Sequence, residues 1–210
     1  IMWSDDEAID ISSLDWQKGN GLLPAVVQDA DTLQVLMLGY MNEKALEQTY
    51  ESGLVTFCSR SRNEIWQKGE TSGNTLQLVS IRVDCDRDTL LVQARPAGPV
   101  CHLGTPGCFD DGLAPGIGFL ARLEQVVSAR RTVPDEQSYT SKLFVAGKKR
   151  IAQKVGEEGV EAALAGATGD TDELKEEAAD LLFHLTVLLQ ANDVPLSEVM
   201  SVLRARHQKS

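Results

Sequence analysis

The feature that most constrains the fold is a change of hydrophobic pattern near the middle of the 210-residue chain. Before it, short runs rich in Val, Leu, Ile and Thr alternate with Gly, Asp and Asn, which is typical of short β-strands. After it, apolar residues recur at three- and four-residue spacing, which is typical of amphipathic helices. Turn-forming residues are concentrated between the two, at 110–118. Two patterns in one chain predict two domains, each with its own core.

We predict a first domain over residues 1–112, a linker over 113–118 and a second domain over 119–210. The first domain is predicted to be an α+β fold centred on a sheet. Its strands are expected at residues 23–27, 33–40, 54–58, 76–83 and 89–93. Asn42 is the predicted N-cap of a helix that ends at Gly53.

The second domain is predicted to be an all-α helical bundle. Its helices are expected at residues 119–130, 138–146, 148–167, 171–191 and 196–206. Asp170 and Glu173 resemble a capping box, and Pro195 stands where a helix can begin. Helices of this number and length form a small bundle.

Charge and hydropathy exclude several classes of protein. The chain has 31 acidic and 20 basic residues, a formal net charge of −11, so it lacks the basic surface of a general nucleic-acid-binding protein. The most apolar stretch, 181–189, is interrupted by His184 and Thr186 and is far shorter than the roughly 18 residues of a membrane span. Residues 1–7 have acids where a secretory signal has its basic region. We therefore expect a cytoplasmic protein with neither nucleic-acid nor membrane partners.

Three of the four cysteines, Cys85, Cys101 and Cys108, lie among Asp, Gly, Pro and His. Four cysteines are too few for a disulfide scaffold, so clustered thiols indicate metal binding or catalysis. Thiolates suit zinc, and three protein ligands leave the fourth position open for water, as in catalytic sites. His102 would either complete a structural site or act in acid–base chemistry beside it. The alternative is that the cysteines are small buried apolar residues, which fits Cys58 best.

Three aspartates alternate around Cys85, at Asp84, Asp86 and Asp88. On an extended strand they would share one face and Cys85 would point to the other. Clustered carboxylate oxygens suit a hard cation such as Mg²⁺, which retains waters and bridges to phosphate. The alternative is a solvated acidic turn.

Two loops upstream of these aspartates have side chains that suit a phosphorylated ligand. They combine guanidinium, ammonium and hydroxyl groups with glycine backbone amides. Either loop alone is weak evidence, because basic and Gly/Ser loop residues are usually just solvated turns. The candidate substrate-binding residues are Arg60, Arg62, Trp66, Lys68, Gly69, Glu70, Thr71 and Ser72.

Three motifs of the first half resemble the phosphoribosyl-AMP cyclohydrolase family. They are Trp-x-Lys-Gly-Glu-Thr-Ser-Gly from Trp66, Asp-Cys-Asp-x-Asp from Asp84 and Cys-His-x-Gly-x-x-x-Cys-Phe from Cys101. The resemblance covers residues 14–109. It implies an enzyme that opens the adenine ring of phosphoribosyl-AMP by hydrolysis between N1 and C6.

The same resemblance implies the ligands of two metals. Catalytic zinc would bind Cys85, Cys101 and Cys108, with Cys85 contributed across a homodimer interface. Magnesium would bind Asp84, Asp86 and Asp88. The zinc would activate a water for attack on the ring, and His102 would move the proton.

Acidic residues follow one face of each of two predicted helices. They recur every three or four residues in the sets Lys154, Glu157, Glu158, Glu161 and Glu173, Glu177, Asp180, His184. If the turn at 166–172 folds the helices into an antiparallel hairpin, the two acidic faces meet and need cations. The alternative is that they are solvated helix faces. The candidate magnesium ligands are Glu157, Glu158, Glu161, Glu177 and Asp180.

The spacing Glu-Glu-x-x-Glu from Glu157 and Glu-x-x-Asp from Glu177 resembles the all-α nucleoside triphosphate pyrophosphohydrolases. Three further motifs resemble phosphoribosyl-ATP pyrophosphatase more narrowly, over residues 119–207. They are Ser-Tyr-Thr-x-Lys-Leu from Ser138, Lys-Arg-Ile-x-x-Lys-Val-Gly-Glu-Glu from Lys149 and Asp-Leu-Leu-Phe-His-Leu from Asp180.

This second resemblance implies that Mg²⁺ held by the carboxylates, with Glu161 essential to catalysis, bridges a triphosphate and orients a water for attack between the α and β phosphorus atoms. Neutralising the pyrophosphate would fall to Lys142, Arg150 and Lys154. His184 is expected to bind substrate or, equally, to be a satisfied core histidine.

The two resemblances, in this order, indicate a bifunctional enzyme of histidine biosynthesis whose substrates are phosphoribosyl-ATP and phosphoribosyl-AMP. One alternative is a pyrophosphohydrolase of another nucleoside triphosphate fused to a structural zinc-binding module. Another is a metal-binding interaction protein, which would unfold on chelation of its zinc.

Overall fold

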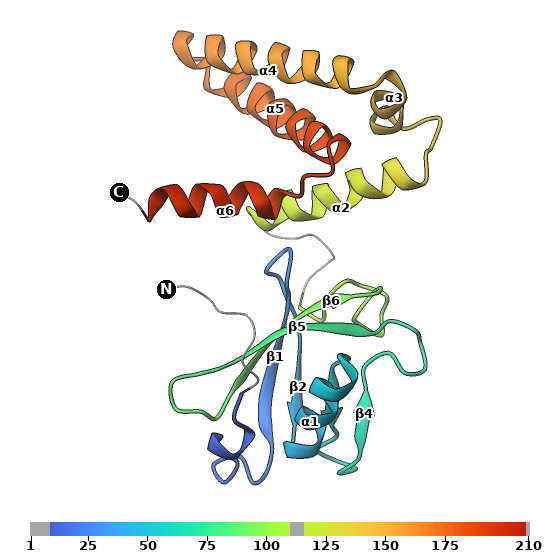
Figure 1. Ribbon diagram of the computed structural model, residues 1–210, viewed down its shortest axis with the longest axis vertical. Coiled ribbons are helices and arrows are strands. Elements are labelled where there is room, and N and C mark those ends of the chain that lie inside the picture. Colours follow the sequence, from blue (N-terminus) through green and yellow to red (C-terminus); the bar gives the residue numbers. More distant parts are fainter. Residues whose placement is uncertain (1–8, 110–115, 209–210) are drawn as a thin grey trace. The chain divides into compact units, whose positions relative to one another are not determined.

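A computed structural model describes residues 9–109 and 116–208 of the chain. It forms two compact units, Ile1–Gly118 and Phe119–Ser210 (Figure 1). Residues 1–7, the predicted end of the first domain at 112, and residues 113–115 of the predicted linker lie outside the described residues. Of the helices that are described, none is long and apolar enough to cross a membrane.

The first unit has the predicted α+β fold centred on a sheet. Four strands form the sheet in the order β2-β1-β6-β5, with β1 and β6 parallel and the other two pairs antiparallel. These strands are β1 (Leu23–Asp29), β2 (Val35–Met41), β5 (Leu76–Val83) and β6 (Leu90–Pro96). A second, two-stranded antiparallel sheet consists of β3 (Thr56–Cys58) and β4 (Ile65–Gln67). The 3-10 turn η1 (Ile11–Ser13) precedes both sheets.

The helix α1 (Glu43–Ser52) has the predicted ends. The side chain of Asn42 accepts a hydrogen bond from the Ala45 N–H at 2.9 Å, and Gly53 follows the helix with a left-handed φ of 69°. Leu46 of α1 and Phe57 of β3 share a core with the inward residues of β1, so these elements pack on one face of the sheet. Alternate residues of β1 are buried, as a strand with one face on a core requires.

Two details of the first unit differ from the prediction. The strand β4 was missed because it has only three residues and follows a polar segment. The strand predicted from residue 33 begins later, because Leu33 has a left-handed φ of 61° in the turn before β2. A β-branched or apolar residue at a turn imitates a strand in the sequence pattern.

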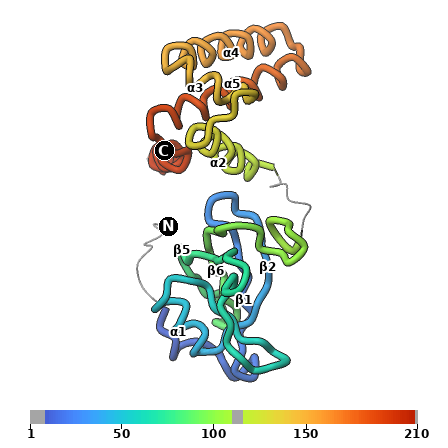
Figure 2. The backbone as a smooth tube through the Cα atoms, turned by 90° about the vertical axis from the view of Figure 1, so that its right-hand side faces the viewer, coloured from blue at the N-terminus to red at the C-terminus, as the bar shows by residue number. Residues whose placement is uncertain are grey.

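The second unit is all-α, as predicted. Its helices are α2 (Gly118–Thr132), α3 (Tyr139–Ala146), α4 (Lys148–Thr168), α5 (Thr171–Ala191) and α6 (Leu196–His207). Figures 1 and 2 show α4 and α5 side by side as a hairpin. Gly169 turns the chain between them with φ 78°, and the Asp170 side chain accepts the first N–H groups of α5. This hairpin brings the two acidic faces together.

Candidate active sites

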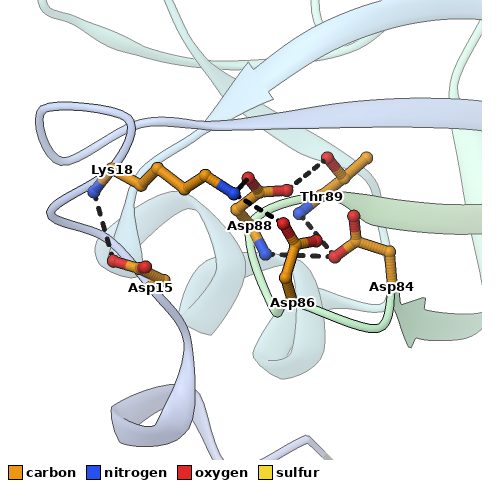
Figure 3. A network of polar contacts seen from close by, with 6 residues as sticks. All are labelled: Asp15, Lys18, Asp84, Asp86, Asp88 and Thr89. Atoms are coloured by element: carbon orange, nitrogen blue, oxygen red, sulfur yellow. Dashed lines mark hydrogen bonds and ion pairs between the residues drawn. The ribbon is translucent and has the colours of Figure 1, made fainter.

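Asp84, Asp86 and Asp88 lie together in the turn that joins β5 to β6 (Figure 3). One carboxylate oxygen of each lies within 4.8 Å of the others. The prediction that they share a strand face was wrong about the backbone, because β5 ends before them and Arg87 has a left-handed φ of 62°. A tight turn nevertheless brings these closely spaced carboxylates to one place.

Backbone N–H groups hold this turn in shape. Oδ1 of Asp84 accepts hydrogen bonds from the N–H groups of Asp88 and Thr89 at 3.0 and 3.1 Å. The Thr89 hydroxyl donates to Oδ1 of Asp88 at 3.0 Å. Two of the three carboxylates are therefore fixed by the turn itself.

A lysine from a distant part of the sequence lies against the same carboxylates. Nζ of Lys18 is 2.5 Å from Oδ2 of Asp86 and also pairs with Oδ2 of Asp88 (Figure 3). Hydrogen bonding to Asp86 and then to Asp88 raises the pKa of Lys18, and the same lysine lowers the pKa of both carboxyls. The group thus includes its own cation, which sequence reasoning missed because no local pattern marks it.

Cys101 and Cys108 lie on the loop after β6, whereas Cys85 lies in the acidic turn. Cys101 is buried, and the other two are exposed. The backbone N–H of Leu103 and then the Thr105 hydroxyl lower the pKa of Cys101, and hydrogen bonding to Cys108 adds to the effect. Two of the three predicted zinc ligands are therefore neighbours. Among the described residues of a single chain, no group of three potential metal ligands includes a cysteine.

His102 is exposed, and its Nδ1 lies 3.9 Å from Sγ of Cys101. Nitrogen and sulfur ligands of one tetrahedral zinc would lie about 3.6 Å apart, from the usual bond lengths. Adjacency in sequence therefore does not keep His102 from a metal on Cys101. Both predicted roles, fourth ligand and proton carrier, stay open.

Lys68 connects the predicted phosphate loop to the cysteine loop. Its Nζ donates to the Val100 carbonyl at 2.6 Å, and its charge helps to lower the pKa of Cys101. Gly69 follows with φ 82°, and a Cβ there would lie 2.3 Å from the backbone of Asn74. Only glycine fits this turn. Three other candidates on the loop are exposed: Glu70, Thr71 and Ser72.

The remaining candidates of the first unit lie around β3 and β4. The Arg60 guanidinium lies over the Tyr40 ring at 4.2 Å and donates to the Tyr40 hydroxyl at 3.2 Å. Arg62 is exposed on the same turn. Trp66 packs against Phe57 with ring centroids 5.2 Å apart, so much of its side chain serves the core.

The second carboxylate group lies in the α4–α5 hairpin. Oxygens of Glu158, Glu161 and Glu177 lie within 4.8 Å of one another. Glu157 and Asp180, also predicted as ligands, are outside this group. The hairpin thus unites three of the five predicted ligands from two helices.

Lys154 compensates only part of this charge. Its Nζ is 2.5 Å from Oε1 of Glu158 and 3.0 Å from Oε2 of Glu157. These ion pairs lower the pKa of both glutamates. Arg150, 3.5 Å from Glu157, adds a weaker pair on the exposed side.

Glu177 has no comparable partner. Its Oε2 is buried and has no hydrogen-bond partner among the described residues. Burial, and then the charges of Glu161 and Glu158, raise the pKa of Glu177. A buried carboxylate oxygen without a donor is unfavourable, so the position favours a bound cation.

His184 is 3% exposed and bonded at both ring nitrogens. Nδ1 lies 2.9 Å from the Asp180 carbonyl oxygen and 3.8 Å from Oε1 of Glu158, and Nε2 lies 3.1 Å from the Tyr139 hydroxyl. This arrangement favours the core-histidine alternative over direct substrate contact. Tyr139 lies within a motif noted in the sequence, but its role as a partner of His184 was missed.

Lys142 lies exposed on α3, one turn from Tyr139. It is placed on a different helix from Arg150 and Lys154, which both belong to α4. The three cationic side chains therefore come from two helices. Both helices belong to the unit that contains the carboxylate group. A polyphosphate needs this combination of cations and metal-binding oxygens.

Comparisons with known proteins also divide the chain into two parts, one in each of the two compact units. Residues 37–110 match the family model of phosphoribosyl-AMP cyclohydrolase. Residues 120–207 match the model of phosphoribosyl-ATP pyrophosphohydrolase.

Curated relatives match almost the whole chain under one name, histidine biosynthesis bifunctional protein HisIE. The protein of Xylella fastidiosa strain Temecula1 is 58% identical over 94% of this chain and 95% of its own. That of Salmonella typhimurium is 56% identical, over 93% and 96%. That of Photobacterium profundum is 53% identical, over 95% and 99%. The chain therefore belongs to the bifunctional HisIE family, with a cyclohydrolase domain first and a pyrophosphohydrolase domain second.

Proposed function

We propose that the second unit hydrolyses phosphoribosyl-ATP to phosphoribosyl-AMP and pyrophosphate. The first unit then opens the adenine ring of phosphoribosyl-AMP by hydrolysis between N1 and C6. The match of both halves to the two enzyme families, in one chain, is the observation that carries this proposal. A cytoplasmic location is part of the same proposal.

In the second unit, Glu158, Glu161 and Glu177 hold Mg²⁺. The buried, unpartnered oxygen of Glu177 supports this assignment, since a metal would satisfy it. When bound, Mg²⁺ would supply positive charge to the triphosphate during hydrolysis of the link between the α and β phosphorus atoms. Glu157 and Asp180, which lie outside this group of three, are the remaining candidate ligands.

The cationic residues of the second unit bind the phosphates that leave. Lys142, Arg150 and Lys154 neutralise the pyrophosphate, and Lys154 already lies beside the carboxylates. His184 acts through its hydrogen bond to Tyr139, which orients the start of α3.

In the first unit, Cys101 and Cys108 of one copy and Cys85 of a second copy hold Zn²⁺ in a homodimer. The separation of Cys85 from the other two thiols within one chain supports this arrangement. When bound, zinc lowers the pKa of a water toward ~7 and so supplies the nucleophile at neutral pH. His102 moves the proton near Cys101, and Lys68 favours the thiolate form of that cysteine.

Asp84, Asp86 and Asp88 would hold Mg²⁺, which would supply positive charge for the phosphate of phosphoribosyl-AMP. The donor set fits the ion, because it consists of clustered carboxylate oxygens in an exposed turn. Substrate contacts come from the loops of Arg60 and Lys68. They include Arg62, Trp66, Gly69, Glu70, Thr71 and Ser72.

Two variants test the two-site assignment. We expect Cys108→Ala to stop ring opening while phosphoribosyl-ATP cleavage continues, and Glu161→Ala to do the reverse. The two reactions are followed separately, by pyrophosphate release and by the absorbance change of the purine ring. Loss of both activities from either single change would contradict the assignment.

The substrate is tested on the intact protein. We expect turnover of phosphoribosyl-ATP to exceed that of ordinary nucleoside triphosphates. Equal turnover would favour a general pyrophosphohydrolase. Chelation of zinc should stop ring opening with the fold of the first unit retained, whereas unfolding would favour a structural zinc module.

A further inference from the structure

We propose that the ammonium of Lys18 occupies the position of the metal in the Asp84–Asp86–Asp88 turn and has to leave when Mg²⁺ binds. Lys18 would then be a competitor of the metal supplied by the chain itself. The inference rests on the magnesium site of the proposed function and goes beyond it, because it gives a role to a residue outside the ligand set.

The contacts of Lys18 are those expected of a bound cation. Its Nζ pairs with Oδ2 of Asp86 at 2.5 Å and with Oδ2 of Asp88. Figure 3 shows the side chain extended across to the turn, with its tip between these two carboxylates. The ammonium therefore contacts two of the three carboxylates that are proposed to hold the metal.

The position of Lys18 is fixed by the fold. The Asp15 N–H donates to the Arg87 carbonyl at 2.9 Å, which joins the Lys18 loop to the acidic turn. The Lys18 N–H donates to Oδ1 of Asp15 at 3.2 Å, and the intervening Trp16 is buried in the core. The guanidinium of Arg87 donates back to the Ser13 carbonyl at 2.7 Å.

The anchored loop increases the net stabilisation that the Lys18 ion pairs provide. Exposed lysine–carboxylate pairs are usually weak, in part because a long side chain loses freedom when it pairs. Here the backbone of Lys18 is already anchored to the turn, so pairing does not also require the loop to become ordered. Lys18 remains half exposed at 51%, which leaves it free to move into solvent.

Ammonium and Mg²⁺ exclude each other at these oxygens. Mg²⁺ binds carboxylate oxygens at about 2.0–2.1 Å and requires near-octahedral geometry. An ammonium 2.5 Å from Oδ2 of Asp86 carries the same sign of charge and competes for the same carboxylates. Exchange of the Lys18 ammonium for Mg²⁺ keeps the negative charge of the turn compensated whether or not the metal is bound. The consequence is a lower affinity for the metal.

The experiment is a titration of the full-length chain with MgCl₂, followed by NMR at the backbone amides of Asp88 and Thr89. These amides donate to Asp84 and so report this site alone, separately from the glutamates of the second unit. We expect Lys18→Met to bind Mg²⁺ about five- to tenfold more tightly than the wild type at low ionic strength. The gain should shrink at high salt, where the competing ion pair is screened.

Matched variants separate charge from shape. Lys18→Arg keeps the cation and should bind Mg²⁺ like the wild type. Lys44→Met removes an exposed lysine of α1 and should change nothing. Lys18→Gln replaces the Met variant if that one loses the wild-type amide spectrum. In the wild type, the side-chain Cε resonance of Lys18 should move toward that of a free lysine as Mg²⁺ is added.

The outcomes separate the proposed role of Lys18 from the existence of the magnesium site. Asp86→Asn should weaken Mg²⁺ binding in both the wild-type and Lys18→Met backgrounds. If it does so but Lys18→Met binds no more tightly than the wild type, the role of Lys18 is overturned and the magnesium site stands. If neither the wild type nor Lys18→Met shows a Mg²⁺-dependent shift at these amides, the site itself is overturned.

Discussion

The two carboxylate groups of this chain differ in how far apart their residues lie in the sequence. The aspartate group comes from one short turn, and its three side chains lie within five consecutive residues. The glutamate group comes from two helices, and only the α4–α5 hairpin brings Glu177 to Glu158 and Glu161. A local group can be recognised from spacing, whereas the second depends on how the helices pair.

The groups also differ in charge compensation. Lys18 pairs with two of the three aspartates, and the turn is exposed to solvent. Lys154 pairs with Glu157 and Glu158, which leaves the buried oxygen of Glu177 without a donor. The difference predicts that a bound cation would stabilise the helical group more than the turn.

The largest effect should follow from Glu177→Gln. This change removes a proposed ligand whose charge is poorly compensated, so kcat/KM for phosphoribosyl-ATP cleavage should fall by about a hundredfold or more. Without metal, the same variant should have a higher Tm than the wild type, because an unfavourable buried charge is gone. Activity assays and thermal unfolding in EDTA measure the two effects.

Glu176→Gln is the matched control, since Glu176 is the exposed neighbour on α5. It should leave both activity and Tm near the wild-type values. A Glu177→Gln variant that keeps full activity would remove Glu177 from the metal site. Equal effects of both variants would show that the helix charge as a whole, not the buried position, is responsible.

The next effect is on the pH dependence of Mg²⁺ binding. The pKa of Glu177 is raised by burial and by Glu161, so protons compete with the metal there as pH falls through the mildly acidic range. The pKa values of Asp86 and Asp88 are lowered by Lys18, so the turn stays ionised over that range. Isothermal titration with Mg²⁺ at several pH values should show weaker binding, accompanied by proton release when Mg²⁺ binds, at the helical group first. Equal weakening at both groups would contradict the comparison.

The same pKa shifts determine how the stability of the metal-free chain changes with pH. A raised native pKa means that the folded chain holds the proton of Glu177 more tightly than the unfolded chain. This contribution to stability is complete below the unfolded pKa and is lost as pH rises through the folded pKa. For Asp86 and Asp88, whose native pKa values are lowered, the contribution is present above the unfolded pKa and is lost as pH falls through the folded pKa.

The smallest effect should follow from Asp84→Ala. The change removes the acceptor of two backbone N–H groups in the turn, so the Tm of the first unit should fall by roughly 3–5 °C. Calorimetry of the metal-free chain measures it. Asp84→Asn, which keeps an acceptor oxygen, is the control and should recover most of the loss. An unchanged Tm in the Ala variant would mean that the turn is held without Asp84.

Local patterns predicted most of the fold because each element carries its own signals. Asn42 caps α1 and Gly53 ends it, and the five predicted helices of the second unit all form, with ends shifted by at most two residues. Where signals were short or ambiguous, prediction failed. The three residues of β4 are too few to show a period, and the aspartates lie in a turn, not on a strand.

The candidate sites followed the same rule. The three aspartates were grouped correctly although the backbone was wrong, because closely spaced side chains meet in a turn as well as on a strand. Sequence spacing could not separate Glu158 from Glu157, because both lie near the same helix face and only the partner helix selects one. The choice between a core and a substrate-binding histidine at His184 needed the positions of Tyr139 and the Asp180 carbonyl.

The sequence by itself determined that this chain has a sheet-centred half and a helical half, and it marked the carboxylates of both halves and the thiols of the first. Those properties depend on residue type and on spacing along the chain. The tertiary structure alone decided how residues distant in the sequence compensate the carboxylates: Lys18 reaches the aspartate turn from another loop, and Glu177 is left with a buried oxygen. Charge compensation depends on distance in space, which residues far apart in the sequence acquire only when the chain folds.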